Sequence, residues 1–164
     1  MTINPDLQGR SYPAKEVYDV GREKIREFAR AVKATHPAHF EVDAAKALGH
    51  SDLVAPPTFA IIVAQRADAQ LIEDPDSGID FSRVVHADQR FIHHRPIVAG
   101  DRLVAELHVD GVRAMGGGAM ITTRSEIFAL AAGAAEAAEA AAGDDTREAV
   151  ATATSSILVR GEGQ

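Results

Sequence analysis

Two segments in the first half of the chain repeat apolar residues at helical spacing. Residues 21–34, "GREKIREFARAVKA", place apolar side chains at i, i+3, i+4 and i+7, while arginine and lysine occupy the other faces. This spacing predicts one helix whose buried face carries Ile25, Phe28, Ala29 and Val32. A shorter helix is predicted over residues 41–50, where Gly49 provides the stop.

Residues 58–73, "TFAIIVAQRADAQLIE", form the most apolar helical candidate in the chain. Positions 60–64 are apolar on nearly all sides, so the first half of this helix must be enclosed by other structure. Polar side chains dominate the second half, which predicts that it faces water; these are Gln65, Arg66, Asp68 and Gln70.

From residue 83 onward the period changes from helical to alternating. Strands are predicted over residues 83–94, 101–115, 119–130 and 149–159, with a glycine turn at 116–118. A short strand is also predicted at 16–20, after an extended lead-in. Strands that follow helices in one uninterrupted series indicate an α+β fold, an antiparallel sheet with helices on one face. A sheet of this length wrapped around one apolar central helix is what a hot-dog fold requires.

Composition and charge narrow the function classes. A chain of 164 residues supports one core, so a single domain over 1–164 is expected, with an alanine-rich, low-complexity insert at about 131–148. There is no cysteine, and the net charge of −7 argues against a nucleic-acid partner. The first residues lack the pattern of a signal peptide, and no apolar run is long enough to span a membrane. A soluble, cytoplasmic protein is expected.

Three stretches carry a resemblance to a known family. They are "YDVGREKIREFARAVKATHPAHF", "LVAPPTFAIIV" and "VVHADQRFIHHRPIVAGDRL", and the last is similar to the F-x-x-P-V-x-x-G-D-x-L segment of MaoC-like hydratases. The chain resembles the actinobacterial MaoC-like dehydratase subunits (UPF0336-type), a group related to the non-catalytic subunits of mycobacterial (3R)-hydroxyacyl-ACP dehydratase. The resemblance runs from about Gly9 to the final strand and omits the alanine-rich insert.

The resemblance implies a catalytic element that this chain carries only in part. Active relatives have D-x-N-P-x-H, in which the histidine moves a proton at C2 of the acyl chain and the aspartate handles the water or hydroxyl at C3. Here the stretch reads "ATHPAH", with His39 at the histidine place and Pro37 at the proline place. Ala34 stands where the aspartate belongs and His36 where the asparagine belongs. A methyl group transfers no proton, so half of the pair is missing.

A second departure lies at the start of the central helix. The resemblance implies a glycine there, whose N–H would hold the thioester oxygen as negative charge develops. Pro57 is nearest that place and has no N–H, although a register one residue later would restore a donor from Thr58.

Other interpretations of the histidines are weaker. His36 and His39 lack a nearby ligand-spaced carboxylate or cysteine, so no metal site is expected. His93 and His94 are adjacent in a strand, which predicts that they point to opposite faces and cannot cooperate. His86 and Asp88 lie two apart and are expected to share one face, as a conceivable substitute pair.

The sequence therefore leaves three functional hypotheses. The first is a dehydratase subunit, acting on acyl-ACP or acyl-CoA, that a second hot-dog chain with an intact catalytic pair completes. The second is a self-sufficient homodimeric hydratase or thioesterase, and the third is a non-enzymatic acyl-binding or structural protein. A dimer is expected in each case, and no cofactor is expected.

Candidate substrate contacts follow from the first hypothesis. The wall of an acyl channel is expected from apolar positions that core packing would also explain: Phe59, Ile62, Val63 and Phe91. An acidic carrier protein would need a local basic patch, for which the candidates are Arg90, Arg95 and Arg102.

Overall fold

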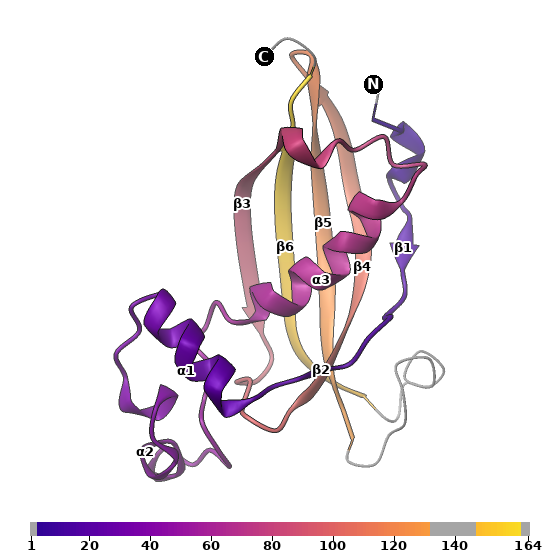
Figure 1. Cartoon of the computed structure of the whole chain (residues 1–164). Coiled ribbons are helices and arrows are strands. Elements are labelled where there is room, and N and C mark those ends of the chain that lie inside the picture. Colours follow the sequence, from indigo (N-terminus) through magenta and orange to yellow (C-terminus); the bar gives the residue numbers. More distant parts are fainter. Residues whose placement is uncertain (1–2, 132–146, 162–164) are drawn as a thin grey trace.

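A single antiparallel sheet forms one layer of the molecule, and α3 lies diagonally across one face of it (Figure 1). The computed structural model describes residues 3–131 and 147–161. Its main strands are joined in the order β1-β4-β5-β6-β3, and β2 also pairs with β4. The strands are β1 (Ser11–Tyr12), β2 (Tyr18–Asp19), β3 (Val84–His93), β4 (Arg102–Met115), β5 (Gly118–Leu130) and β6 (Arg147–Val159).

The core lies between α3 (Ala60–Glu73) and the sheet. Inward-facing positions of β4 and β5 alternate with outward ones, so that Leu103, Leu107, Ile121 and Ile127 are fully buried. Phe59, just before α3, is also fully buried and packs edge-on against Phe28 and Tyr18. The predicted α+β hot-dog architecture, an antiparallel sheet around a central helix, is confirmed in the described residues.

The two smaller helices lie together beyond one end of β3 and α3 (Figure 1). They are α1 (Arg22–Ala31) and α2 (Val42–Ala47). The predicted buried face of α1 is confirmed at Ile25 and Ala29, which are both fully buried. Val32 is 45% exposed, contrary to the prediction, because the helix ends at Ala31 and Lys33 adopts a left-handed φ of 58°.

Short elements appear where the sequence suggested only an extended lead-in. A 3-10 turn, η1 (Pro5–Leu7), begins at Asn4, whose side chain accepts a hydrogen bond from the N–H of Asp6. Leu7 in this turn is fully buried. Two further 3-10 turns are η2 (Pro37–His39) and η3 (Phe81–Arg83).

The alanine-rich insert and the membrane prediction remain to be compared with the structure. Most of the alanine-rich insert falls in 132–146, outside the described residues, so that prediction and the single-domain assignment stay predictions. In the part that is described, no helix is both long and apolar enough to cross a bilayer.

Candidate functional site

The loop after α1 is shaped by a proline and a histidine side chain. Pro37 opens η2, where its missing N–H costs nothing, and the Nδ1 of His36 accepts a hydrogen bond of 3.2 Å from the N–H of Ala38. His36 thus caps the turn as an asparagine would. This gives a local reason why a histidine is accommodated at the place of the motif's asparagine.

His39 at the end of η2 is held in one tautomer. Its Nδ1 lies 2.7 Å from the carbonyl oxygen of Val54, and a carbonyl can only accept. In the neutral imidazole, the proton therefore sits on Nδ1 and the lone pair is on Nε2. A half-buried imidazole in this state is equipped to accept a proton.

His39 borders a cavity of about 580 Å³ whose lining is rich in imidazoles. The cavity lies between η2, the approach to α3 and the corner after β3. Its lining contains no aspartate or glutamate among the described residues, and Ala34 is not part of it. The lining residues are His36, His39, Val54, Ala55, Pro56, Pro57, His93, His94, Arg95, Pro96 and Ile97.

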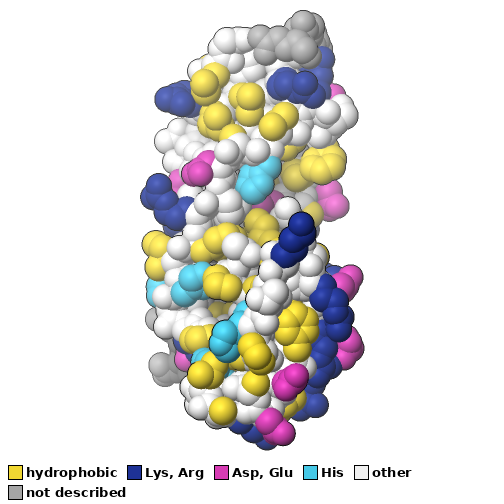
Figure 2. Space-filling view, turned by 90° about the vertical axis from the view of Figure 1, so that its left-hand side faces the viewer, with side chains coloured by type: hydrophobic (Ala, Val, Ile, Leu, Met, Phe, Trp, Pro, Cys, Tyr) yellow, Lys and Arg dark blue, Asp and Glu magenta, His cyan; other side chains and the backbone are white. Residues whose placement is uncertain are grey.

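The prediction that His93 and His94 cannot cooperate is wrong, because both line this cavity. Strand β3 ends at His93, and the chain turns there. The cause is Val150, an extra residue in β6 opposite the Ile127–Phe128 step of β5. Its carbonyl accepts hydrogen bonds from the N–H groups of both His94 and Arg95, at 2.8 and 3.3 Å. The strict alternation of a strand therefore does not extend to His94. Figure 2, which views the β3 side, shows the histidines gathered mainly in its lower half, among apolar side chains.

The three arginines expected to form a basic patch differ in whether an acidic side chain pairs with them. Arg95 donates to both carboxylate oxygens of Asp101, at 2.8 and 3.0 Å, and to Glu148 at 2.9 Å. The hydrogen bonds to Asp101 raise the pKa of Arg95 above its ordinary value. Arg102 pairs with Asp19 at 3.5 Å. Arg90 is exposed and has no ion pair among the described residues, so it is the candidate whose charge is uncompensated.

The start of α3 offers few backbone donors to a bound oxygen. Pro57 lines the His39 cavity and has no N–H, and the N–H of Phe59 is taken by the carbonyl of Pro56 at 2.9 Å. Helical residues begin only at Ala60. Thr58 is therefore the first residue after Pro57 whose N–H is a candidate for this role.

None of the four predicted wall residues lines the His39 cavity. Phe59 is fully buried in the core, and Ile62 packs against that core. Val63 borders a different hollow on another side of α3. Phe91 comes nearest to the cavity, because its ring stacks on that of His93 with 6.1 Å between centroids.

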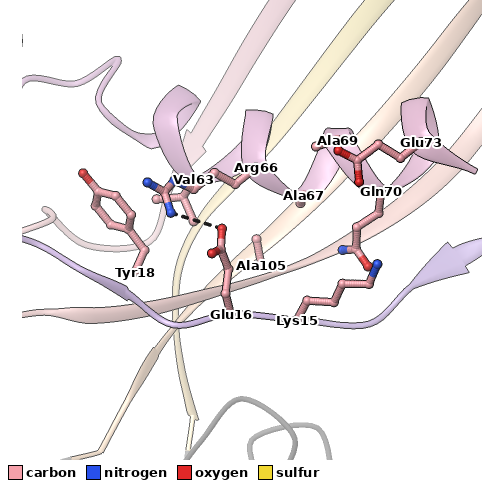
Figure 3. A pocket seen from close by; sticks show the side chains of 10 residues that line it. All are labelled: Lys15, Glu16, Tyr18, Val63, Arg66, Ala67, Ala69, Gln70, Glu73 and Ala105. Carbon is pink, nitrogen blue, oxygen red and sulfur yellow. Dashed lines mark hydrogen bonds and ion pairs between the residues drawn. The ribbon is translucent and has the colours of Figure 1, made fainter.

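The hollow beside Val63 lies between α3 and the segment that joins β1 to β2 (Figure 3). It measures about 390 Å³. Arg66 dominates it, reaching Glu16 at 3.1 Å and lying 4.9 Å from the centre of the Tyr18 ring. The charge of Arg66 is therefore already paired with Glu16 of the same chain.

The predicted pairing of His86 with Asp88 on one face is also wrong. A β-bulge lies between these two residues, which pair with adjacent residues of β6, Ile157 and Ser156. Adjacent strand residues point to opposite faces, so His86 faces α3 and Asp88 faces away. Across from His86 lies Asp68 of α3, whose carboxyl accepts a hydrogen bond from Thr123 at 3.1 Å.

The sequence analysis did not identify Asp68 as a candidate site residue, because a charged side chain in a helix was taken to face water. Burial raises the pKa of its carboxyl from 3.8 to about 6, while the hydrogen bond from Thr123 and the charge of His86 act in the opposite direction. The available signal was its spacing: Ile61, Asp68 and Ile72 stand at i, i+7 and i+11 on one helical face. Gln70, also predicted to face water, is buried and donates to the carbonyl of Pro13 at 3.2 Å.

A group of potential metal ligands occurs on the outer face of the sheet. Glu106, His108 and Glu126 bring ligand atoms within 4.8 Å of one another. However, Glu106 is paired with Arg147 and Glu126 with Arg124. These carboxylates are already neutralised, and we assign no metal site here.

Comparison with known proteins places this geometry in a family. Residues 6–131 match the model described as "FAS1-like, dehydratase domain region". A UPF0336 protein of Clavibacter michiganensis subsp. michiganensis is 49% identical over 162 residues, covering 99% of both chains.

Solved structures agree with the sequence match. The truncated HadBC (3R-hydroxyacyl-ACP dehydratase) complex of Mycobacterium tuberculosis is similar with a TM-score of 0.76 and 35% identity, over 93% of this chain and 97% of that one. A MaoC-like dehydratase gives 0.75 and 32%, over 94% of this chain and 42% of that one. The chain belongs to the FAS1-like dehydratase-region family, among the MaoC-like hot-dog proteins.

Proposed function

We propose that this chain is a subunit of a (3R)-hydroxyacyl-thioester dehydratase, working on acyl-ACP or acyl-CoA, and that a second hot-dog chain completes it. The observation that carries the proposal is the lining of the His39 cavity, which has four imidazoles and no carboxylate among the described residues. Reversible loss of water needs a base at C2 and an acid at the C3 oxygen in one geometry. The cavity has the base-type group without the carboxyl that the family pairs with it.

His39 is the residue of this chain that we assign to the reacting region. Its Nε2 lone pair, fixed by the contact of Nδ1 with Val54, matches what a base at C2 needs. Pro57 nearby withholds one of the donors that would stabilise the thioester oxygen. Both features favour a site that retains the geometry of a dehydratase but depends on another chain for turnover.

The free edge of β3 is our candidate for the contact with that chain. Strand β3 ends the sheet order and pairs only with β6 among the described strands. Val85 and Ile92 on it are 42% and 54% exposed, and Phe81 just before it is 66% exposed. An open, apolar edge favours pairing with a second sheet. The similarity to the HadBC complex of Mycobacterium tuberculosis supports a heterologous partner.

Phe91 and Arg90, neighbours on opposite faces of β3, are our candidates for contacts with the acyl chain and with its carrier. Phe91 is the wall candidate we retain beside the cavity, with Ile62 and Val63 as more distant positions and Phe59 as core packing. Arg90 is the exposed basic residue we propose for an acidic carrier. These assignments rest on the proposed subunit role.

The decisive experiment compares the purified chain with a co-expressed pair. The partner should be a hot-dog chain with an intact D-x-N-P-x-H element, and the assay is hydration of crotonyl-CoA and of longer enoyl thioesters. We expect activity from the pair and none from either chain alone. Robust activity from the single chain that survives His39→Ala would contradict the proposal.

One observation favours a self-sufficient enzyme instead. Four imidazoles in one cavity include enough groups for one to donate a proton while another accepts. Under that alternative, the single chain is active and loses activity in His39→Ala. An inactive homodimer without any partner would favour an acyl-binding or structural role.

A further inference from the structure

A second cavity runs along α3 on the side that faces β3 and β6. It measures about 560 Å³, within the range of small-molecule sites. Ile61 and Ile72 mark its extent on the helix, eleven residues or about 16 Å apart. Its apolar walls come from α3, η3, β3 and β6, and consist of Ile61, Leu71, Ile72, Phe81, Val84 and Ile157. The dimensions and the walls suit an extended aliphatic chain.

Asp68 interrupts this apolar wall halfway along the helix. Its Oδ1 accepts from Thr123, and its Oδ2 accepts no hydrogen bond from the described residues. Among the residues that the structure describes, no lysine or arginine lines the cavity. A half-buried carboxyl with a single neutral donor carries a desolvation cost, and aspartate is a poor helix former, so folding alone does not account for it.

Two other polar groups of the cavity, Ser155 and His86, already have hydrogen-bond partners, and Gln65 on its lining is exposed. Ser155 donates to the Oε1 of Gln89 at 2.7 Å, and the Nε2 of His86 lies 3.1 Å from the same oxygen. Gln89 is oriented by its Nε2, which donates to the carbonyl of Thr154 at 3.1 Å. The wall therefore has an unused acceptor at Asp68 and no unused cation to match an anionic ligand.

The acidic side chains of the cavity limit the chemical class of ligand that it can bind. Asp68 and, at its exposed end, Glu73 are both acidic. A fatty carboxylate would meet like charge, and a purely apolar chain would leave Asp68 unpaired. A neutral donor on an aliphatic chain satisfies both constraints.

We propose that this cavity binds an aliphatic ligand carrying a hydroxyl group, with the hydroxyl donating to Asp68 and the chain lying between Ile61 and Ile72. The hydrogen bond is charge-assisted and partly sheltered from water, and both features strengthen it. The inference concerns a different cavity from that of His39 and does not depend on the dehydratase proposal.

Isothermal titration calorimetry at pH 8 with 1-decanol, decyl methyl ether and decanoate tests the proposal on the full chain. The ether has the same alkyl chain without a donor, and decanoate replaces the donor by an anion. We expect 1-decanol to bind about 10- to 100-fold more tightly than either, the range of one hydrogen bond to a charged group. Equal affinity for the alcohol and the ether overturns the proposal, as does tighter binding of decylammonium than of 1-decanol.

Two variants locate the preference. Asp68→Leu should keep ether binding but abolish the preference for the alcohol, and Asp68→Ala serves the same purpose if the leucine crowds the cavity. Glu73→Gln removes the other lining carboxylate and should leave the preference intact. A preference that survives at Asp68→Ala, or disappears at Glu73→Gln, contradicts the assignment of the hydroxyl to Asp68.

Discussion

The cavity around His39 and the cavity around Asp68 lie at the start and along the length of the same helix, yet their chemistry is opposite. Among the described residues, the first is lined by four imidazoles and an arginine with no carboxylate, and the second by two carboxylates and one imidazole with no lysine or arginine. The comparison shows that His39 has no carboxyl group in its own cavity, although two carboxyl groups line a separate cavity beside the same helix. Catalysis depends on that geometry and not on the inventory of groups.

The largest expected effect comes from restoring the motif's aspartate at Ala34, which stands in the same loop as His39 although the alanine itself does not line the cavity. Ala34→Asp should raise hydration of crotonyl-CoA by the single chain at least about 100-fold over its background, the lower range for a positioned acid or base. The gain should vanish in Ala34→Asp combined with His39→Ala. Ala34→Asn, of matched shape but without a titrating group, is the control, and an equal gain from it would contradict the interpretation.

A smaller effect is expected when the carboxyl is removed from the other cavity. The folded-state pKa of Asp68 is about 6, above the unfolded value, so the folded chain binds more protons between about pH 4 and pH 6. This carboxyl therefore lowers the free energy of unfolding as pH rises through that window, by about 1–3 kcal/mol. The stability difference between Asp68→Leu and the unmodified chain should grow by this amount from pH 4 to pH 8, measured by urea denaturation. Asp68→Asn should show the same growth, and a constant difference would contradict the raised pKa.

The corner that brings His93 and His94 to the His39 cavity should depend on Asp101. Its carboxylate holds Arg95 twice and also accepts from the N–H of Val98 at 2.9 Å. Because the pair is mostly shielded, Asp101→Ala should cost about 2 kcal/mol of unfolding free energy. The exposed pair of Lys24 and Glu27 is the control, where Glu27→Ala should cost at most about 0.5 kcal/mol. Equal losses in urea denaturation would show that the corner is not held by Asp101.

The smallest effect is expected at His36. His36→Ala removes the cap of η2 and should lower the unfolding free energy by about 0.5–1 kcal/mol. His36→Asn restores an acceptor at the same place and should recover most of this loss. If the two variants are equally destabilised, His36 acts through contacts other than the cap.

The sequence predicted the fold where a local period reflects burial. Alternation placed β4, β5 and β6 within two residues of their observed bounds, and Ile25 and Ala29 marked the inner face of α1. The prediction failed where a distant residue changes the local rule. The extra Val150 in β6 redirects His94, and the bulge within β3 separates His86 from Asp88.

Only the part of the candidate site that lies within one short sequence motif could be predicted. His39 and the gap at Ala34 stand within one loop, so a family resemblance could identify both. Two further imidazoles of the cavity, those of His93 and His94, come from a segment more than fifty residues later, and their convergence with His39 depends on the three-dimensional packing of η2 against the corner after β3. Asp68 required knowing which face of α3 the sheet encloses.

The bulge in β3 has a consequence for comparing relatives of different length. Val84, Val85 and His86 pair with 159, 158 and 157, and pairing resumes at Asp88 with 156, so Ala87 is the one residue of the strand without a partner. A chain lacking this residue would keep every other cross-strand neighbour and every inward or outward orientation. A one-residue gap at this position therefore leaves the rest of the ladder unchanged, whereas the same gap at Gln89 would turn Asp88, the residue between it and the bulge, to the other face.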